Sequence, residues 1–437
     1  MNDNASLRFA RHTLGPLFLM TACPPFVFVI LHTHTALAGS FSAMAAQFRN
    51  DGIFATLWVL TAPHMLGSPT AWSCIGAFAV LQLALMRVLP GARWEGPVTP
   101  KGNVPVYKAN GVAALATTLA LWFAATEGLA LFEGAILYDN LGDIYGALNT
   151  FSLIFCLLLY FKGRFAPSTS DSGHSGNPVF DYYWGTELYP RVLGWDLKQF
   201  TNCRFGMMGW PVLLLSYAAA QVDRQGSLSD GMLVAVGIQL FYVAKFFWWE
   251  TGYLRSLDIM HDRAGFYICW GCLVWVPSVY TQSTLFLVDH PVSYGTTLTA
   301  LLLAAGIACV TINYLADADR QRVRATGGNT LVWGRPPELI RAPYSTAEGE
   351  TRENLLLVSG WWGLARHFHY LPEIAGAIFW TLPVGFNHAL PWFYVVFLSV
   401  LLFDRARRDD ARCAAKYGAV WAQYKLRVKW EVIPGVY

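Results

Sequence analysis

Long apolar runs recur along this chain and are separated by polar segments rich in turn-forming residues. About ten of the runs are long enough to cross a membrane as helices. Their approximate limits are 14–34, 70–90, 110–132, 147–162, 207–222, 231–250, 264–288, 297–316, 371–386 and 388–404. Part of 53–66 is also apolar and suits a re-entrant or interfacial segment. The pattern predicts an all-α, polytopic integral membrane protein.

The long polar segments fall on one side of the membrane when the spans are counted from the N-terminus. These segments are 163–206, 317–370 and 405–437. Of the 31 Lys and Arg residues, those that do not lie on that side or at span ends facing it are Arg49, Arg224 and Lys245. Because basic residues are retained in the cytoplasm, we expect both termini, and any pocket for a soluble anionic cofactor, to be cytoplasmic.

Polar and aromatic clusters are concentrated in the second part of the chain. Region 1–165, with about four spans, contains few of them and is expected to be a scaffold. Region 166–437, with about six spans, is expected to form the catalytic part. No GxGxxG follows a strand pattern and no Walker loop is present, so a dinucleotide would be held without a Rossmann domain.

Composition agrees with a membrane protein and excludes several other classes. The chain is 55% hydrophobic and 14% charged, whereas soluble proteins carry about 25% charged residues. A net charge of +3 gives no reason to expect a nucleic-acid partner. Cys269 and Cys272 have CxxC spacing but lie in a span without a second pair, so buried thiols are expected rather than a metal or redox site.

Four clusters carry the residue types that chemistry requires. They are 175–191 (SGNPVFDYYWGTELYPR), 248–262 (WWETGYLRSLDIMHD), 356–370 (LLVSGWWGLARHFHY) and 404–424 (DRARRDDARCAAKYGAVWAQY). Structural interpretations stay open beside the functional ones: an aromatic belt at the membrane interface, a Lys245–Glu250 pair, and a solvated basic end of the last span. His367 and His369 are two residues apart and cannot share a helix face, so we expect no metal site.

Taken together, the four clusters resemble the membrane sterol reductase family. The similarity is carried by GNPVFDYYWGTELYPR, WETGYLRSLDIMHDRAGFY, LLVSGWWGLARHFHY and RDDARCAAKYGAVWAQYKLRVKWEVIPGVY, and it covers about 170–437. The family comprises sterol C14-, C7- and C24(28)-reductases and the membrane domain of lamin B receptor. It implies NADPH-dependent reduction of a sterol double bond, with the sterol entering from the bilayer. It also implies the inner membrane for a bacterial chain or the endoplasmic reticulum for a eukaryotic one.

The resemblance assigns particular residues to NADPH. Carried over motif by motif, they are Arg320, Arg324, Leu357, Trp362, His369, Tyr370, Asp409, Cys413, Tyr417 and Tyr424. Arginine pairs suit a 2′-phosphate, and aromatic side chains suit the rings of the cofactor. The chain departs from the family pattern at Tyr189, at Phe205, at His369 and at 372–373, where the family usually has Asn, Pro, Asn and Gly-Asp.

The motifs give mixed signals about which bond is reduced. Residues 175–178 (SGNP) resemble the C14-reductases, whereas 331–336 (LVWGRP) and 366–368 (RHF) resemble the C7-reductases. Since the first motif lies nearer the expected sterol pocket, we expect a Δ14-sterol reductase, with a Δ7-sterol reductase as the alternative.

An isolated ring alkene accepts hydride poorly, so the reaction should begin with protonation and end with hydride transfer. The acid must be close to the ring and shielded from water. We favour Glu250 as a member of the proton relay, with further candidates Asp258, Tyr242 and His261.

Two other function classes remain open at this stage. The R-H-x-x-Y and K-Y-G-x-x-W-x-x-Y patterns within 366–424 also resemble isoprenylcysteine carboxyl methyltransferases, but that match leaves 175–262 unexplained. A non-enzymatic sterol-binding protein is the third possibility. The sequence does not define the oligomeric state.

Overall fold

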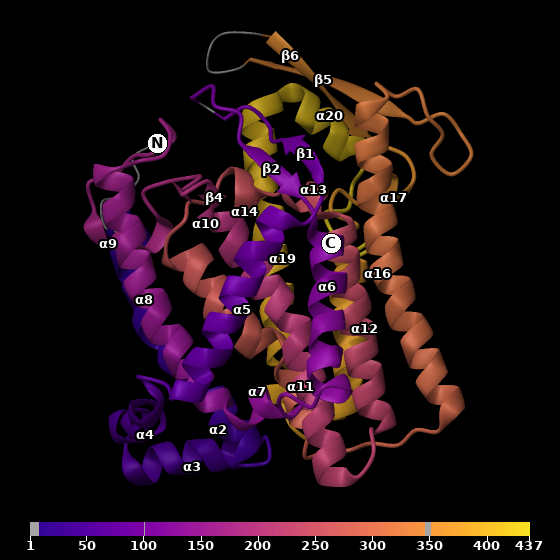
Figure 1. The fold of residues 1–437 in the computed structure, drawn as a ribbon. Helices are drawn as coiled ribbons and strands as arrows, with labels where there is room; N and C mark the ends of the chain where they lie inside the picture. Colours follow the sequence, from indigo (N-terminus) through magenta and orange to yellow (C-terminus); the bar gives the residue numbers. More distant parts are fainter. Residues whose placement is uncertain (1–7, 100, 346–350) are drawn as a thin grey trace. The chain divides into compact units, whose positions relative to one another are not determined.

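The structure is a computed structural model that describes residues 8–99, 101–345 and 351–437. These residues are mostly helical and contain three small two-stranded sheets (Figure 1). No Rossmann sheet occurs within the described ranges. The predicted all-α membrane class is therefore confirmed.

By internal contacts the chain divides into two compact units. Unit 1 comprises Met1–Ser293 with Val384–Pro391, and unit 2 comprises Tyr294–Pro383 with Trp392–Tyr437. This division differs from the expected boundary at 165/166, which separated a scaffold from a catalytic part. That functional boundary stays a prediction.

Unit 1 contains most of the long helices. Its longer helical elements are α2 (Gly15–Thr35), α3 (Phe41–Asp51), α4 (Ile53–Thr61), α5 (Pro69–Val88), α6 (Gly111–Phe123), α8 (Leu141–Phe165), α11 (Met207–Gln225), α12 (Asp230–Trp248) and the π-helix η5 (Phe266–Tyr280). In Figure 1, α3 and α4 lie at one end of α2, while α9, α10 and α14 lie toward the opposite end of this unit.

Short elements join these helices. They are η1 (Ala10–Leu14), η2 (Ala62–His64), β1 (Ala92–Glu95), β2 (Val106–Ala109), η3 (Ala124–Gly128), α7 (Ile136–Asp139), α9 (Pro178–Trp184), β3 (Arg191–Val192), β4 (Trp195–Asp196), α10 (Leu197–Gln199), η4 (Phe200–Gly206), α13 (Glu250–Tyr253), α14 (Leu257–Met260) and α15 (Gln282–Leu287). Strand β1 pairs antiparallel with β2, and β3 with β4.

Unit 2 is a smaller helical group with one β-hairpin. Its elements are α16 (Thr296–Ala325), β5 (Leu339–Ser345), β6 (Thr351–Leu357), α17 (Trp361–Leu364), α18 (Tyr370–Thr381), α19 (Phe393–Tyr417) and α20 (Ala419–Arg427), with 3-10 turns η6 (Leu382–Val384) and η7 (Leu390–Trp392) at the points where the chain passes between the units. Helix α18 packs on α16 and α19, and β5 packs on α19 and α20.

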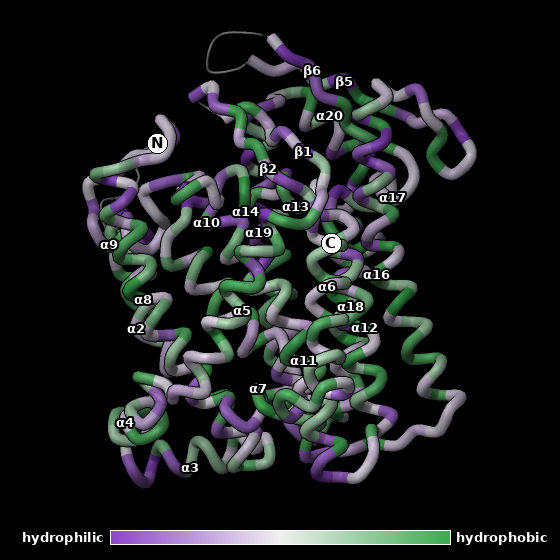
Figure 2. The backbone as a smooth tube through the Cα atoms, in the orientation of Figure 1, coloured by the Kyte–Doolittle hydropathy of each residue, from purple (hydrophilic) through white to green (hydrophobic). Residues whose placement is uncertain are grey.

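Seven helical stretches among the described residues are long and apolar enough to cross a membrane. They are Ala10–Thr35, Pro69–Val88, Gly111–Gly128, Leu141–Phe165, Leu197–Gln225, Asp230–Trp248 and Thr296–Ala325. Three further predicted spans coincide with η5 and α15, with α18, and with α19. Figure 2 shows mainly hydrophobic residues along the middle of α5, α6, α11 and α12. Helix α4 has 9 residues, about 13 Å at 1.5 Å per residue, and is too short to cross.

Local sequence explains where several helices start and stop. The side chains of Ser40, Ser68 and Ser229 accept a hydrogen bond from the backbone N–H three residues later and cap α3, α5 and α12. Helix α11 ends at Gly226, whose φ of +76° is left-handed. The π-helical segments η4 and η5 have no comparable sequence signal.

Candidate functional site

The candidate cofactor residues of unit 2 begin where α16 becomes polar. The Arg320 guanidinium carbon lies 4.0 Å from the centre of the Trp362 ring, and its Nη2 pairs with Asp317 at 2.8 Å. The Arg320 Nε is buried without a hydrogen-bond partner. Trp362 is held in place because its indole N–H donates to the Ala316 carbonyl at 2.7 Å. A cation over a fixed aromatic face, with one donor unused, suits an anionic ligand that carries flat rings.

Arg324 and Leu357 extend this group toward the β-hairpin. Arg324 lies one turn beyond Arg320 on the same helix face, and its Nε donates to the Leu355 carbonyl at 3.4 Å. The Tyr424 hydroxyl donates to the Leu357 carbonyl at 3.2 Å. Leu357 is buried in one cluster with Val323, Val332 and Trp362. Helix α16, strand β6 and helix α20 therefore meet around the candidate residues.

Helices α19 and α20 supply the remaining polar groups. Asp409 pairs with Arg412, and the Cys413 thiol donates to the Asp409 carboxylate at 3.7 Å. The Tyr417 hydroxyl accepts a hydrogen bond from the Asn354 side chain at 2.9 Å. Tyr417 and Tyr424 share a buried cluster with Ala342, Leu356, Trp421 and Val428. Asp409, Cys413 and Tyr417 lie on α19 and Tyr424 lies on α20, so two successive helices bring these side chains together in unit 2.

The rings of His367, His369 and Tyr370 pack close to one another. Tyr370 lies 4.2 Å from the His369 ring and 5.3 Å from the His367 ring, the latter nearly parallel at 8°. The His369 ring is also 5.0 Å from the ring of Trp362. All ten predicted cofactor residues lie in unit 2. Apart from Arg324, which bonds to the Leu355 carbonyl, the contacts above link each of them to another member of the set.

Arg366 and Asp410 are two residues that sequence reasoning missed. Arg366 is buried, and its Nη1 donates to the carbonyls of Val428 and Lys429, both at 2.9 Å. Asp410 accepts from the Trp421 indole at 3.0 Å and pairs with Lys425 at 3.2 Å. Arg366 Nε is 3.8 Å from the Asp410 carboxylate. The pair joins the segment after α17 to α19 and to the end of α20.

Burial controls protonation in this cluster. Burial, together with the neighbouring His369, lowers the pKa of His367 below its usual range, and Asp409 opposes the shift. The His367 Nε2 lies 3.7 Å from Asp409. Burial, reinforced by Asp409, raises the pKa of the Cys413 thiol to about 12. Cys413 is therefore a neutral thiol near pH 7 and a poor nucleophile.

In unit 1, Glu250 is part of a buried ion pair. Its Oε1 lies 2.6 Å from Arg204 Nη2, and its Oε2 accepts from the Gly111 backbone N–H at 2.8 Å. Glu250 is 2% exposed and Arg204 is 0% exposed. A Cβ at residue 111 would lie 2.8 Å from Glu250 Oε2, so only glycine fits here. Each of these contacts uses Glu250 as an acceptor.

The other proton-donor candidates differ in burial. Tyr242 and Asp258 are half-buried, whereas His261 is exposed. The Lys245 ammonium lies 4.8 Å from the centre of the Tyr242 ring, and the Trp210 ring is 5.6 Å away. Asp258 belongs to the short helix α14, which follows α13 and Glu250 along the chain. All four candidates lie in unit 1.

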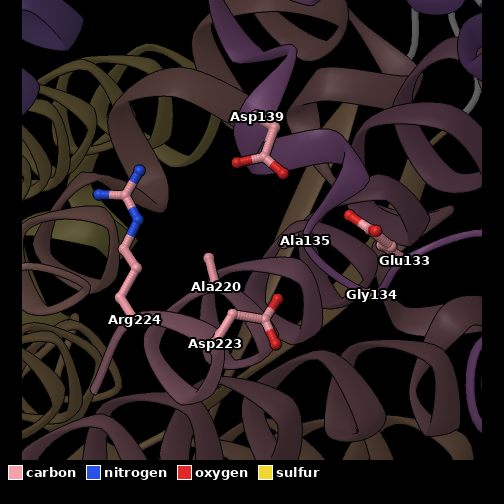
Figure 3. Close-up of a pocket in the computed structure, with 7 residues that line it drawn as sticks. All are labelled: Glu133, Gly134, Ala135, Asp139, Ala220, Asp223 and Arg224. Carbon is pink, nitrogen blue, oxygen red and sulfur yellow. The ribbon is translucent and has the colours of Figure 1, made fainter. Parts of the chain in front are cut away.

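A cavity of about 490 Å³ in unit 1 contains none of the predicted residues (Figure 3). It is lined by Glu133, Gly134, Ala135, Asp139, Ala220, Asp223 and Arg224. Arg224 pairs with Asp289 at 2.7 Å. Among the described residues, no group of three or more His, Cys, Asp or Glu side chains has the arrangement of a metal site. The eight cysteines are free thiols.

These features define a class: an integral membrane protein whose candidate cofactor residues lie on helices and a hairpin, outside any Rossmann fold. The family model for ergosterol biosynthesis ERG4/ERG24 proteins matches residues 22–437. The chain belongs to this family. It is a sterol reductase, an oxidoreductase that acts on a carbon–carbon double bond, and the predicted resemblance is confirmed.

Relatives cover almost the whole chain. A 7-dehydrocholesterol reductase of Arabidopsis thaliana is 52% identical over 426 residues, 96% of each chain. A Delta(14)-sterol reductase of Methylotuvimicrobium alcaliphilum is 35% identical over 444 residues, which is 100% of this chain and 98% of the relative. A 7-dehydrocholesterol reductase of Xenopus laevis is 35% identical over 374 residues, 84% of this chain and 79% of the relative.

Proposed function

We propose that this protein reduces the Δ7 double bond of a sterol, using NADPH. The observation that carries the choice of bond is the 52% identity, over 96% of both chains, to a protein named 7-dehydrocholesterol reductase. The sequence motifs alone led us to expect Δ14 first. We now place Δ7 first, because the relative named for Δ14 is 35% identical.

The cofactor proposal rests on the chemistry of unit 2. The unused, buried Nε of Arg320 is the kind of donor that a phosphate oxygen would satisfy. Arg320 and Arg324 would hold the 2′-phosphate, and Trp362, His369 and Tyr370 would contact the rings. Leu357, Asp409, Cys413, Tyr417 and Tyr424 would complete the set. Bound NADPH would supply hydride, and the residues named here would bind and orient it.

The candidate proton donors predicted from sequence all lie in unit 1. Glu250, which we favoured from sequence, accepts every hydrogen bond described above and pairs with Arg204. We therefore assign Glu250 to holding the fold and propose Tyr242 as the donor, with Asp258 as the alternate and His261 less suited because it is exposed. A phenol near an ammonium at membrane depth suits acid catalysis.

The test follows the two hydrogen atoms that the reduction adds. Purified protein is incubated with NADPH and separate Δ7 and Δ14 sterols, and the products are identified by mass spectrometry. With NADPH carrying deuterium at nicotinamide C4, one deuterium should enter the Δ7 product, and with D₂O a second should enter from solvent. Reduction of the Δ14 sterol alone would overturn the choice of bond.

The Δ14 sterol is the second candidate substrate. Residues 175–178 (SGNP), which resemble the C14-reductases, favour it. The same incubation separates three outcomes: Δ7 only, Δ14 only, or both bonds. A methyltransferase would instead consume a methyl donor and leave NADPH unchanged.

We also propose that both termini and the cofactor residues face the cytoplasm, because the basic residues gather on that side when ten spans are counted. Accessibility tags at Tyr437 and in the loop 226–229 test this proposal. The two tags should be reached from opposite sides of the membrane. Labelling of both from one side would overturn the orientation.

A further inference from the structure

The chain makes a strained two-residue turn shortly after α16. Val332 and Arg335 exchange backbone hydrogen bonds of 2.8 and 3.2 Å. Between them, Trp333 has φ +51° and Gly334 has φ +76°, the left-handed pair that marks a type I′ turn. Asn, Asp or Gly usually takes the first position, and a bulky side chain there strains the backbone.

The side chain at the strained backbone position is exposed. Trp333 is 56% exposed, and Leu331 beside it is 57% exposed. Arg322 and Arg335 are exposed as well. Two large apolar side chains and Arg335 therefore gather at the turn, and Arg322, which pairs with Asp319 at 2.5 Å, lies beside it on α16. The Trp333 ring contacts Trp361 within the chain, but more than half of its surface remains open to a contact outside the chain, and the backbone cost at this position is consistent with such a contact.

This turn continues the outward face of α16. Exposed residues on that helix include Leu301, Ala304, Ala308, Leu315 and Arg322. Their spacing of three, four and seven residues keeps them on one face. Arg322 Nη2 donates to the Leu331 carbonyl at 3.3 Å and so joins the end of this face to the turn. On a membrane-crossing helix, the exposed apolar part of such a face contacts lipid.

The length of α16 places the turn near the lipid headgroups. From Thr296 to Ala316 the helix is largely apolar, and at about 1.5 Å per residue it spans about 31 Å, close to the hydrocarbon thickness. Arg322 lies six residues further, about 9 Å along the axis. Its long side chain can reach back into the headgroup layer. Tryptophan is enriched at this depth.

We propose that the turn 331–335, with Arg322, is a binding surface for anionic lipid headgroups. Leu331 and Trp333 insert among the headgroups, and Arg322 and Arg335 contact the phosphates. Each cation near an anionic membrane surface adds to the electrostatic attraction between protein and lipid. Lipid is the expected ligand because the turn continues the lipid-facing side of α16 and because it combines exposed apolar groups with cationic groups.

The turn is also connected to the candidate cofactor cluster, so lipid at this surface should affect cofactor binding. Val332 is 3% exposed and packs in one cluster with Leu357 and Trp362. The ring of Trp333 meets Trp361 edge-on at 4.9 Å. If lipid orders the turn, Val332 should become more ordered, and so should Leu357 and Trp362, against which it packs. This second part rests on the proposed NADPH function.

The experiment uses the whole chain in nanodiscs of phosphatidylcholine alone or with about 30% phosphatidylglycerol, the anionic component. Hydrogen exchange of the amides of Val332 and Arg335 reports on the turn without any cofactor. In the anionic discs their exchange should slow by about threefold or more, and the NADPH Kd should fall by a similar factor.

Variants isolate the surface. Trp333→Asn combined with Arg335→Gln removes the ring and one cation, while asparagine tolerates the left-handed backbone, so the lipid dependence should vanish. Arg335→Gln alone should reduce it and serves if the double variant does not fold. Arg341→Gln, an exposed cation on β5 that pairs with Glu353, is the matched control and should behave as the parent.

The outcomes separate the two proposals. Equal exchange in both kinds of disc, or an undiminished lipid effect in the folded variants, would overturn the headgroup surface. A lipid effect on exchange without one on the NADPH Kd would overturn the coupling. Absence of NADPH binding in every disc would instead count against the proposed function, and the exchange measurement would still decide the lipid surface.

Discussion

Units 1 and 2 of this helical membrane protein each contain charged side chains, but the two sets of charges differ in how deeply they are buried. In unit 1, the Glu250–Arg204 pair is almost wholly buried. In unit 2, the side chains of Arg320 and Asp409 are 30% and 22% exposed. A soluble ligand can reach the second set and not the first. The comparison separates charges that hold the fold from charges that are available to a cofactor.

The largest expected effect is at the buried pair. Glu250→Gln would leave Arg204 buried without a counter-charge and should cost about 3–5 kcal/mol of unfolding free energy, measured by denaturation in detergent. The control is Glu338→Gln, whose carboxylate forms an exposed pair with Arg427 and contributes about 0–1 kcal/mol.

An opposite result at Glu250 would break the comparison. If Glu250→Gln kept its stability but lost about 10²-fold or more in turnover, Glu250 would be the proton donor. Under our proposal that kinetic loss should appear instead in folded Tyr242→Phe.

Removal of the accessible cations should change cofactor choice rather than stability. Arg320→Ala with Arg324→Ala deletes two charged donors and should weaken NADPH binding by about 2–4 kcal/mol, with little change for NADH. Fluorescence titration of the reduced nicotinamide measures both affinities. Arg341→Ala is the matched control, because it removes an exposed cation on β5 that pairs with Glu353 and is not among the candidate cofactor residues. If the affinities for NADPH and NADH fall equally, neither arginine binds the 2′-phosphate.

His367 should make unit 2 sensitive to acid. Because its folded pKa is lowered, the unfolded chain binds the proton more readily, so this contribution to stability is complete above about pH 6.5. It is lost as the pH falls below that value, by at most about 1.4 kcal/mol per pH unit. Tm measured between pH 8 and pH 5 should fall less steeply in His367→Gln. If Tm falls equally with pH in the parent and in His367→Gln, His367 is not the source of the acid sensitivity.

The smallest expected effect is at a neutral hydrogen bond within the same cluster. Asn354→Ala removes the donor to the Tyr417 hydroxyl and should cost about 1 kcal/mol. Thermal unfolding measures the loss, and Tyr417→Phe, which removes the other partner, should show a similar value. A cost as large as that of Glu250→Gln would remove the distinction between the two units.

Sequence reasoning identified the features that local pattern encodes. Apolar runs predicted the membrane helices, because about 20 apolar residues are needed to cross the bilayer. Motif resemblance predicted the set from Arg320 to Tyr424 in unit 2. The partner of Glu250 was missed, because Arg204 lies in another segment and nothing near Glu250 specifies it. Arg366 was missed since it binds backbone carbonyls, which have no signature in sequence.

The division into units and the π-helices were also beyond prediction. The return of Val384–Pro391 to unit 1 depends on tertiary packing. Segment η5 has the apolar composition of an ordinary membrane helix, and the mixed sequence of η4 contains no residue pattern specific to a π-helix, so composition does not predict the wider hydrogen-bonding pattern.

The π-helix η4 has a consequence for how this chain tolerates insertions and deletions. In a π-helix each N–H bonds five residues back, one more than in an α-helix, so the segment 200–206 holds a surplus residue. Deletion of one residue there, with Arg204 kept to pair with Glu250, would let the turn relax to α geometry, and the flanking segments would keep nearly the same relative rotation. In an ordinary α-helix such as α12, deletion of one residue would instead rotate the flanking segments by about 100° relative to each other. A one-residue deletion in η4 should therefore be less damaging than one in the middle of α12, although it shortens the chain equally.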